Sequence, residues 1–158
     1  AVLDRPDLLE VALRADAFVA RELESADGRL LRSWNEGVAR YDATLEDHAL
    51  LACARIDLFA ATGDPAHLDR ALRLADAMLR RFHDDAGGAF FLTPSDGEAL
   101  VDRPKPSFDG SLPSANAAAA DLPPLPAATK AAVQQVYDEL VRRAAARASR
   151  TPFVRGVH

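Results

Sequence analysis

The sequence contains a single cysteine, Cys53, and few aromatic residues, which make up 6% of its 158 positions. One cysteine excludes an intramolecular disulfide and a cysteine-based metal site, and it favours a reducing compartment, so we expect a cytoplasmic protein. No apolar run approaches the ~18 residues that a membrane-spanning helix needs. The charged residues near the start, among them Asp4 and Arg5, are not typical of a signal peptide. We therefore expect no membrane partner.

The main part of the chain also lacks an excess of positive charge. The formal net charge is −5, and residues 130–158 contribute +4 of it, which leaves −9 on the first 129 residues. An acidic body argues against a nucleic-acid partner. Apolar residues make up 49% of the chain and charged residues 27%, and alanine, leucine and arginine far outnumber β-branched residues. This composition is typical of one soluble, helix-rich domain.

Caps and apolar spacing predict five helices. The expected starts are Pro6, Thr44, Pro65 and Ser114, followed by a fifth helix over about 129–147. In the third helix the apolar residues recur at spacings of three and four, which indicates one buried stripe. The fourth helix is expected to end near residue 121, because three prolines follow it closely.

Long and short connections alternate between these helices. The segments around 35–37 and 95–97 each read as two short strands about a turn, whereas a tight turn at 62–65 joins the second and third helices. Antiparallel helices place every second connection at the same end, so both long loops should share one face. We therefore predict an all-α fold of stacked antiparallel helical hairpins, a partial α/α toroid with short β-hairpin loops on one face.

Three stretches carry a resemblance to a known family, namely DGRLLRSW, TLEDHALLACARIDLFAATGDPAHLDRALRLADAMLRRF and GGAFFLTPSDGEALVDRPKPSFDGSLPSAN. Over about residues 5–120 the chain resembles the helical domain of the YyaL-like, spermatogenesis-associated, thioredoxin-domain-containing proteins. The resemblance implies a fold similar to the (α/α)6 toroids of N-acylglucosamine 2-epimerases and six-hairpin glycosidases. It also implies that the quoted motifs surround a cavity of the size of a sugar.

The chain departs from this family at three places. It has no Cys-x-x-Cys motif, so redox chemistry is not carried over, and His48 stands where the family usually has tyrosine. Prolines interrupt the chain after residue 121, so we assign 1–121 to a partial α/α-toroid domain and 122–158 to a proline-rich break plus a C-terminal helix packing on the same domain. Five helices do not complete a ring. A fragment, a self-assembling sector and an open helical layer remain alternatives.

The second and fourth helices should point their N-termini into the predicted cavity, and the candidate site residues lie there and in the long loops. The acid–base candidates are Asp47, His48 and Asp109. The substrate-binding candidates are Trp34, Arg103, Lys105, Ser114 and Asn116. The expected ligand is a small carbohydrate, and we predict no metal and no cofactor.

Each candidate also has a structural interpretation. Asp47 suits the third position of a helix N-terminus, and Trp34 suits an anchor that holds the strand pair to the core. The other binding candidates suit contacts within loops and at helix ends: Arg103 and Lys105 with Asp102 or Asp109, and Ser114 and Asn116 as caps. His67 and His83 are predicted to be solvated, because neither has a metal-ligand spacing to another residue.

Two functions follow from these observations. The first is a carbohydrate-directed protein with an epimerase-like or glycosidase-like cavity, and whether it is an enzyme stays open. The alternative is a non-catalytic helical module that binds another protein or itself, because an incomplete ring leaves apolar helix edges exposed. A homo-oligomer is expected under this alternative.

Overall fold

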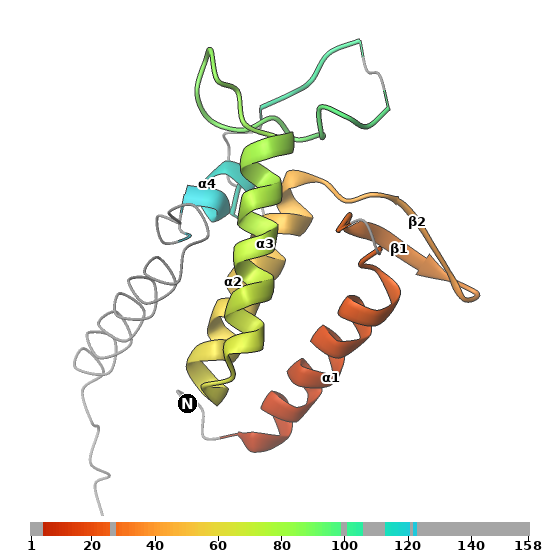
Figure 1. Cartoon of the computed structure of the whole chain (residues 1–158), viewed down its shortest axis with the longest axis vertical. Coiled ribbons are helices and arrows are strands. Elements are labelled where there is room, and N and C mark those ends of the chain that lie inside the picture. Colours follow the sequence, from red (N-terminus) through yellow and green to blue (C-terminus); the bar gives the residue numbers. More distant parts are fainter. Residues whose placement is uncertain (1–4, 26–27, 99–100, 106–112, 121, 123–158) are drawn as a thin grey trace, which may run out of the picture. The chain divides into compact units, whose positions relative to one another are not determined.

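The computed structural model describes residues 5–25, 28–98, 101–105, 113–120 and 122, all within a unit that spans residues 1–122 (Figure 1). The predicted C-terminal helix over about 129–147 and the predicted site residue Asp109 lie outside the described residues. In chain order the elements are α1 (Pro6–Glu22), β1 (Leu31–Asn35), β2 (Val38–Asp42), α2 (Leu45–Thr62), α3 (Pro65–Arg81) and α4 (Ala115–Ala120). The prediction of a mostly helical chain is confirmed.

Helices α2 and α3 form the best-packed pair, and local sequence signals set their ends. The backbone N–H and the hydroxyl of Thr44 both donate to the Asp47 carboxylate, at 2.7 and 2.9 Å, which closes the first turn of α2. Gly63 ends α2 in the left-handed conformation with φ of 73°, and the Asp64 side chain then accepts the Ala66 N–H at the start of α3. The tight connection predicted between these helices is confirmed.

Helix α2 occupies the centre of the described unit. It packs most extensively against α3, less against α4 and least against α1 (Figure 1). The core between α2 and α3 is built from alanine, leucine and larger apolar side chains, including Ala49, Ala52, Phe59, Leu68 and Met78. Small residues on both helices allow their backbones to approach closely, which explains why so alanine-rich a sequence packs well.

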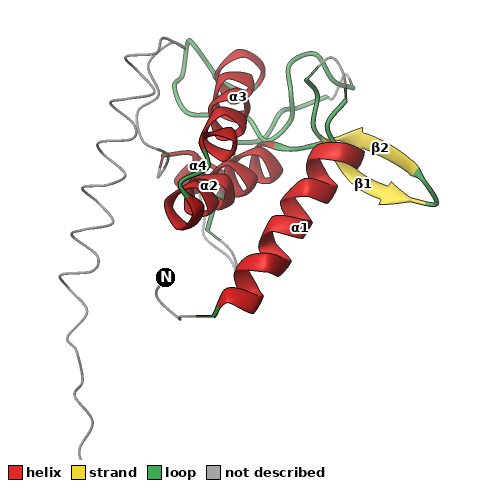
Figure 2. Ribbon diagram, turned by 60° about the horizontal axis from the view of Figure 1, so that its bottom comes forward, coloured by secondary structure: helices red, strands yellow, loops and turns green. Residues whose placement is uncertain are grey.

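The strand pair predicted around 35–37 forms as expected. Strands β1 and β2 are antiparallel, with Leu31 opposite Asp42 and Asn35 opposite Val38. The two central turn residues, Glu36 and Gly37, both have positive φ, at 49° and 80°, as a two-residue type I′ turn requires. Figure 2 shows the hairpin at the C-terminal end of α1, away from the α2–α3 turn.

The prediction of a second strand pair around 95–97 is wrong for the described residues. Instead of a ladder, the Ser95 N–H donates to the Arg81 carbonyl at 2.7 Å. The Asp96 carboxylate meets Arg81 at 2.8 Å and Arg29 at 3.0 Å. These contacts bind the turn to the end of α3 and to the base of the hairpin, and they take up the Ser95 N–H that a strand ladder could have used. Pro94 also removes one donor that a ladder would need.

The described residues do not themselves show a toroid. They show packed helix pairs and one two-stranded hairpin, which are parts that such a ring would need. Within this described part of the chain, no helix combines the length and the apolar character needed to cross a membrane.

Candidate functional site

The long loops meet at the end of the molecule where α2 begins. The Leu45 N–H donates to the Leu92 carbonyl at 2.9 Å, and the Leu92 N–H donates to the Pro104 carbonyl at 2.8 Å. These two bonds join the start of α2 to both sides of the loop that follows α3. The predicted gathering of the loops at one end is therefore seen for the described residues.

The Asp47 side chain contacts both Thr44 and the hairpin at the start of α2. Besides the two bonds from Thr44, its carboxylate lies 3.7 Å from the Arg32 Nε on β1. The side chain is partly exposed and links the start of α2 to the hairpin. The catalytic role predicted for Asp47 stays a prediction, whereas its position at the helix start matches the structural interpretation.

His48 is completely buried, with 0% of its surface exposed. Its Nδ1 lies 2.8 Å from the Thr44 carbonyl, so Nδ1–H is the donor, and the Phe82 ring packs on the imidazole edge-on at 4.9 Å. Burial lowers the pKa of His48 below its ordinary value, and the nearby Arg81 charge lowers it further, against the opposing effect of the Thr44 bond. Acid–base chemistry at His48 would require this end to open, and that role stays a prediction.

Arg103 lies across the loop rather than at its surface. Its guanidinium donates to the backbone carbonyls of Arg81, at 3.3 Å, and of Thr93. It also lies 4.2 Å from the centre of the Phe91 ring. Arg103 therefore holds the end of α3 and the following loop together.

Lys105 holds the same loop from the other side. Its ammonium pairs with Asp84, donates to the Gly88 carbonyl at 3.0 Å and lies 4.7 Å from the Phe91 ring centre. The hydrogen bond from Lys105 lowers the pKa of Asp84 to about 2. The structural interpretation of Arg103 and Lys105 was that they hold the loop together. Both do so, but through partners other than the expected Asp102.

Ser114 and Asn116 fix the start of α4. The Ser114 hydroxyl accepts the Ala117 N–H at 3.1 Å, as a helix cap does. The Asn116 amide makes a two-way contact with the backbone of Phe90: its Oδ1 accepts the N–H at 2.9 Å and its Nδ2 donates to the carbonyl at 3.0 Å. A substrate-binding role for these two residues stays a prediction.

Trp34 both anchors the hairpin and remains accessible. Its ring meets Phe18 of α1 edge-on at 5.5 Å, yet 42% of the residue is exposed. Arg32 lies two residues earlier and hence on the same face of β1, and by the strand register Tyr41 is the residue opposite Arg32. Tyr41 is 71% exposed and has φ of 62°. We call Arg32, Trp34, Tyr41 and Asp47 the hairpin site.

A second constellation, which the sequence reasoning missed, joins three helices around Asp16. The Asp16 carboxylate of α1 meets Arg55 of α2 at 2.8 Å, and it meets His67 and Arg70 of α3 at 3.1 and 3.2 Å. Arg55 also pairs with Glu24. The prediction that His67 is solvated is wrong, because this ion cluster buries it.

The environment of Asp16 keeps it ionised. Burial would raise the pKa of Asp16, but the Arg55 hydrogen bond and the charges of Arg55, His67 and Arg70 lower it below its ordinary value. A buried carboxylate paired with Arg55 and Arg70 in this way is stable only while those partners stay in place.

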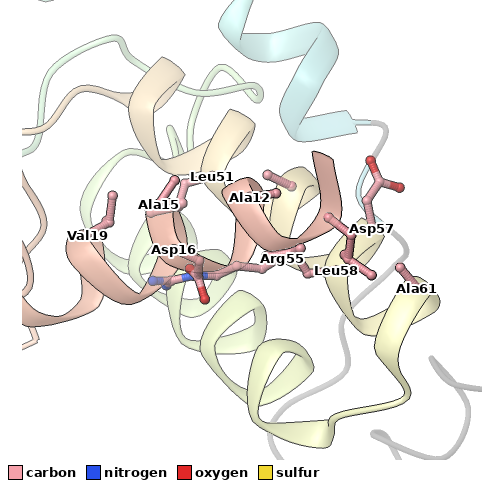
Figure 3. A pocket seen from close by; sticks show the side chains of 11 residues that line it. Ala12, Ala15, Asp16, Val19, Leu51, Arg55, Asp57, Leu58 and Ala61 are labelled. Atoms are coloured by element: carbon pink, nitrogen blue, oxygen red, sulfur yellow. The ribbon is translucent and has the colours of Figure 1, made fainter. Parts of the chain in front are cut away.

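An apolar groove lies beside this ion cluster, between α1 and α2 (Figure 3). Its volume is about 460 Å³. Small and medium apolar side chains line most of it, with Asp16, Arg55 and Asp57 as the charged residues: Leu9, Ala12, Ala15 and Val19 come from α1, and Leu51, Ala54, Leu58 and Ala61 from α2.

No group of three or more histidine, cysteine, aspartate or glutamate side chains suited to a metal ion occurs within the residues that the structure describes. The charged clusters there consist of carboxylates paired with arginine, lysine or histidine.

Comparison with known proteins finds a partial similarity. The chain is similar to spermatogenesis-associated protein 20. The human protein is 34% identical over 130 residues, which cover 76% of this chain and 16% of the relative, and the rat protein is 31% identical over the same shares. No model of a protein family matches the chain. The chain thus spans about a sixth of the relatives' length, and the predicted resemblance is confirmed as a distant, partial similarity.

Proposed function

We propose that this chain is a carbohydrate-binding helical module, and that the hairpin site holds the face of a pyranose ring. The observation that carries the proposal is the exposure of Trp34. Contact with Phe18 keeps the indole in place while 42% of the residue stays open to solvent. A fixed, accessible aromatic ring offers the apolar surface on which the C–H face of a sugar packs.

Polar groups for the sugar hydroxyls begin two residues before Trp34, at Arg32 on the same face of β1. Arg32 and Asp47 form a pair at 3.7 Å, and both side chains are partly exposed. The long separation leaves guanidinium N–H groups and carboxylate lone pairs able to bond a hydroxyl that bridges them. An aromatic platform next to a donor–acceptor pair is a combination that suits neutral sugars.

Tyr41 supports the same proposal through its backbone. A bulky residue with φ of 62° is strained, and an exposed side chain at 71% gains no burial that would offset this strain. Backbone strain of this kind concentrates at ligand sites. We interpret Tyr41 as a second aromatic contact at the rim of the hairpin site.

The proposal extends to the ring predicted from the resemblance. Helices α2 and α4 would belong to its inner layer, and the hairpin would stand at the mouth of the cavity. We propose binding and not catalysis, because His48 is buried and Asp47 bonds the first turn of α2.

The test uses the fluorescence of Trp34, which is the only tryptophan in the chain. Methyl pyranosides, namely the glucoside, galactoside, mannoside and N-acetylglucosaminide, are titrated into the full chain, with sorbitol as the open-chain control. At least one pyranoside should give a saturable change in the millimolar range, and sorbitol should give none.

Arg32→Gln should weaken the binding of that pyranoside about tenfold, which corresponds to one charge-assisted hydrogen bond of about 1.4 kcal/mol. Arg40→Gln is the matched control, because residue 40 lies on the other face of the hairpin and loses the same charge. An equal effect of both substitutions, or no saturable change with any pyranoside, would contradict the proposal.

A further inference from the structure

Arg55 of α2 bonds two acidic residues on the segment that leads into the hairpin. Its Nε donates to Asp16 of α1 at 2.8 Å, and its Nη2 donates to Glu24, which lies two residues after α1 ends. Figure 3 shows the Asp16 and Arg55 side chains pointing toward one another. Because the guanidinium is planar and its N–H groups are fixed in direction, Arg55 sets the positions of both carboxylates relative to α2.

Apolar packing alone does not fix the position of α1. Of its 17 residues only Asp16 is buried, and Val19 and Leu23 are partly buried against a cluster around Leu30. A groove of about 460 Å³ lies along the side of α1 that faces α2, so close packing does not hold the helix there. Apolar contacts have no preferred direction. The directional bonds of Arg55 therefore set where α1 lies.

Helix α1 in turn supports the exposed indole of the hairpin. The Phe18 ring meets Trp34 edge-on, with the ring centres 5.5 Å apart and the planes at 77°. Asp16 and Phe18 are two positions apart, so their side chains leave the helix in directions about 200° apart. One side of α1 thus faces Arg55 while the opposite side holds Trp34, and a shift of the helix at Asp16 moves Phe18 against the indole.

Glu24 gives the same guanidinium a second and shorter connection to the hairpin. Glu24 forms an isolated antiparallel bridge with Leu30, the residue before β1. Next to this bridge, the Leu31 N–H donates to the Leu23 carbonyl at 2.8 Å. The carboxylate that Arg55 holds therefore belongs to the backbone pair from which β1 begins.

We infer that Arg55 is a positioning residue for the hairpin site: it fixes Asp16 and Glu24, and through them the orientation of Trp34. Arg55 is only 1% exposed and acts through α1 and the base of β1, without touching a ligand. This role rests on the proposed function, because a sugar binds more tightly to an indole that is already ordered. An ordered side chain avoids the entropy that its immobilisation would otherwise cost on binding.

The experiment uses three variants of the full chain. Glu24→Ala removes one carboxylate from Arg55 and leaves the bond to Asp16, so this variant should fold. Glu24→Gln keeps an oxygen acceptor at the same position and is the conservative variant. Glu10→Ala is the matched control, because Glu10 is an exposed residue of α1 that pairs with Arg14 and carries the same charge. Circular dichroism should show the helix content of the unchanged chain in all three.

The first readout needs no sugar. Time-resolved fluorescence anisotropy reports the motion of the indole of Trp34, the only tryptophan in the chain. Glu24→Ala should increase the amplitude of the subnanosecond decay about twofold, because a side chain that loses its support moves on this timescale. Glu24→Gln and Glu10→Ala should both stay close to the unchanged chain.

The second readout is the affinity for the best-binding methyl pyranoside. Glu24→Ala should raise the dissociation constant about three- to tenfold, which corresponds to the ordering cost of one side chain. The order of preference among the four pyranosides should stay the same, because no group that contacts the sugar is changed. Glu24→Gln should restore the affinity of the unchanged chain.

An unchanged anisotropy decay in Glu24→Ala would overturn the inference even if urea unfolding shows a lower stability, since a merely structural contact lowers stability without freeing the indole. An equal change in Glu10→Ala would overturn it as well. Equal pyranoside affinities of the unchanged chain and Glu24→Ala would overturn the positioning role and leave sugar binding intact. If no pyranoside binds, the proposed function fails, and the anisotropy decay alone decides whether Arg55 positions Trp34.

Discussion

Replacing Arg55 by alanine should lower the free energy of unfolding by about 3–5 kcal/mol. Arg55 is only 1% exposed and bonds both Asp16 and Glu24, so its loss leaves two carboxylates without their main partner. The hydrogen bond and the charge of Arg55 are the largest causes that hold the pKa of Asp16 low. Urea unfolding at pH 7 measures the loss.

The pH dependence gives a second readout for this variant. Because folding lowers the pKa of Asp16, its carboxylate stabilises the folded state at pH values above its ordinary pKa of 3.8. This stabilisation is lost as the pH falls below 3.8 and through the lower pKa of the folded state. In Arg55→Ala the pKa of Asp16 should rise, so acid unfolding should begin at a higher pH. Arg73→Ala, on the exposed side of α3, should cost less than about 1 kcal/mol. Equal effects of the two alanine variants would contradict a stabilising ion cluster.

Replacing Phe82 by alanine should cost about 3–5 kcal/mol, because its ring is fully buried and packs on His48. The substitution should also admit water to the imidazole and raise the pKa of His48 toward its ordinary value, since burial is the main cause of its lowering. Proton NMR titration of the histidine ring signals measures that shift.

The sign of the pH effect follows from the same shift. Because the folded state binds a proton on His48 less readily than the unfolded chain, stability is full above about pH 6.5 and falls as the pH drops below it. Phe82→Ala should flatten this slope. Leu79→Ala, an exposed position one turn earlier, is the control and should change neither the stability nor the slope appreciably. An unchanged slope in Phe82→Ala would show that Phe82 does not set the environment of His48.

Local signals were enough to predict much of this fold. Thr44 with Asp47, Gly63, and Asp64 before Pro65 mark helix ends by bonds within a few residues, and each lies where the sequence placed it. The hairpin at 35–37 likewise depends on a turn of two residues. Such features need no knowledge of distant parts of the chain.

Contacts between distant residues could not be predicted in this way. Asp16 and Arg55 are separated by 39 positions, and nothing near either residue marks it as buried. The prediction of strands around 95–97 was wrong for the same reason. Asp96 pairs with Arg81 and Arg29, which belong to other parts of the fold, and nothing near Asp96 in the sequence indicates these contacts. The candidate site was partly predictable: Trp34 and Asp47 were named from the sequence, whereas Arg32 and Tyr41 emerged only from the strand register and the backbone.

Sugar binding at the hairpin site is tested most directly by NMR of the full chain during titration with the best-binding methyl pyranoside. The single indole N–H signal of Trp34 and the ring signals of Tyr41 should shift together and saturate together. The methyl signals of Leu58 in the groove should stay in place. Shifts confined to the groove, or an indole signal that does not move at saturating sugar, would contradict the claim.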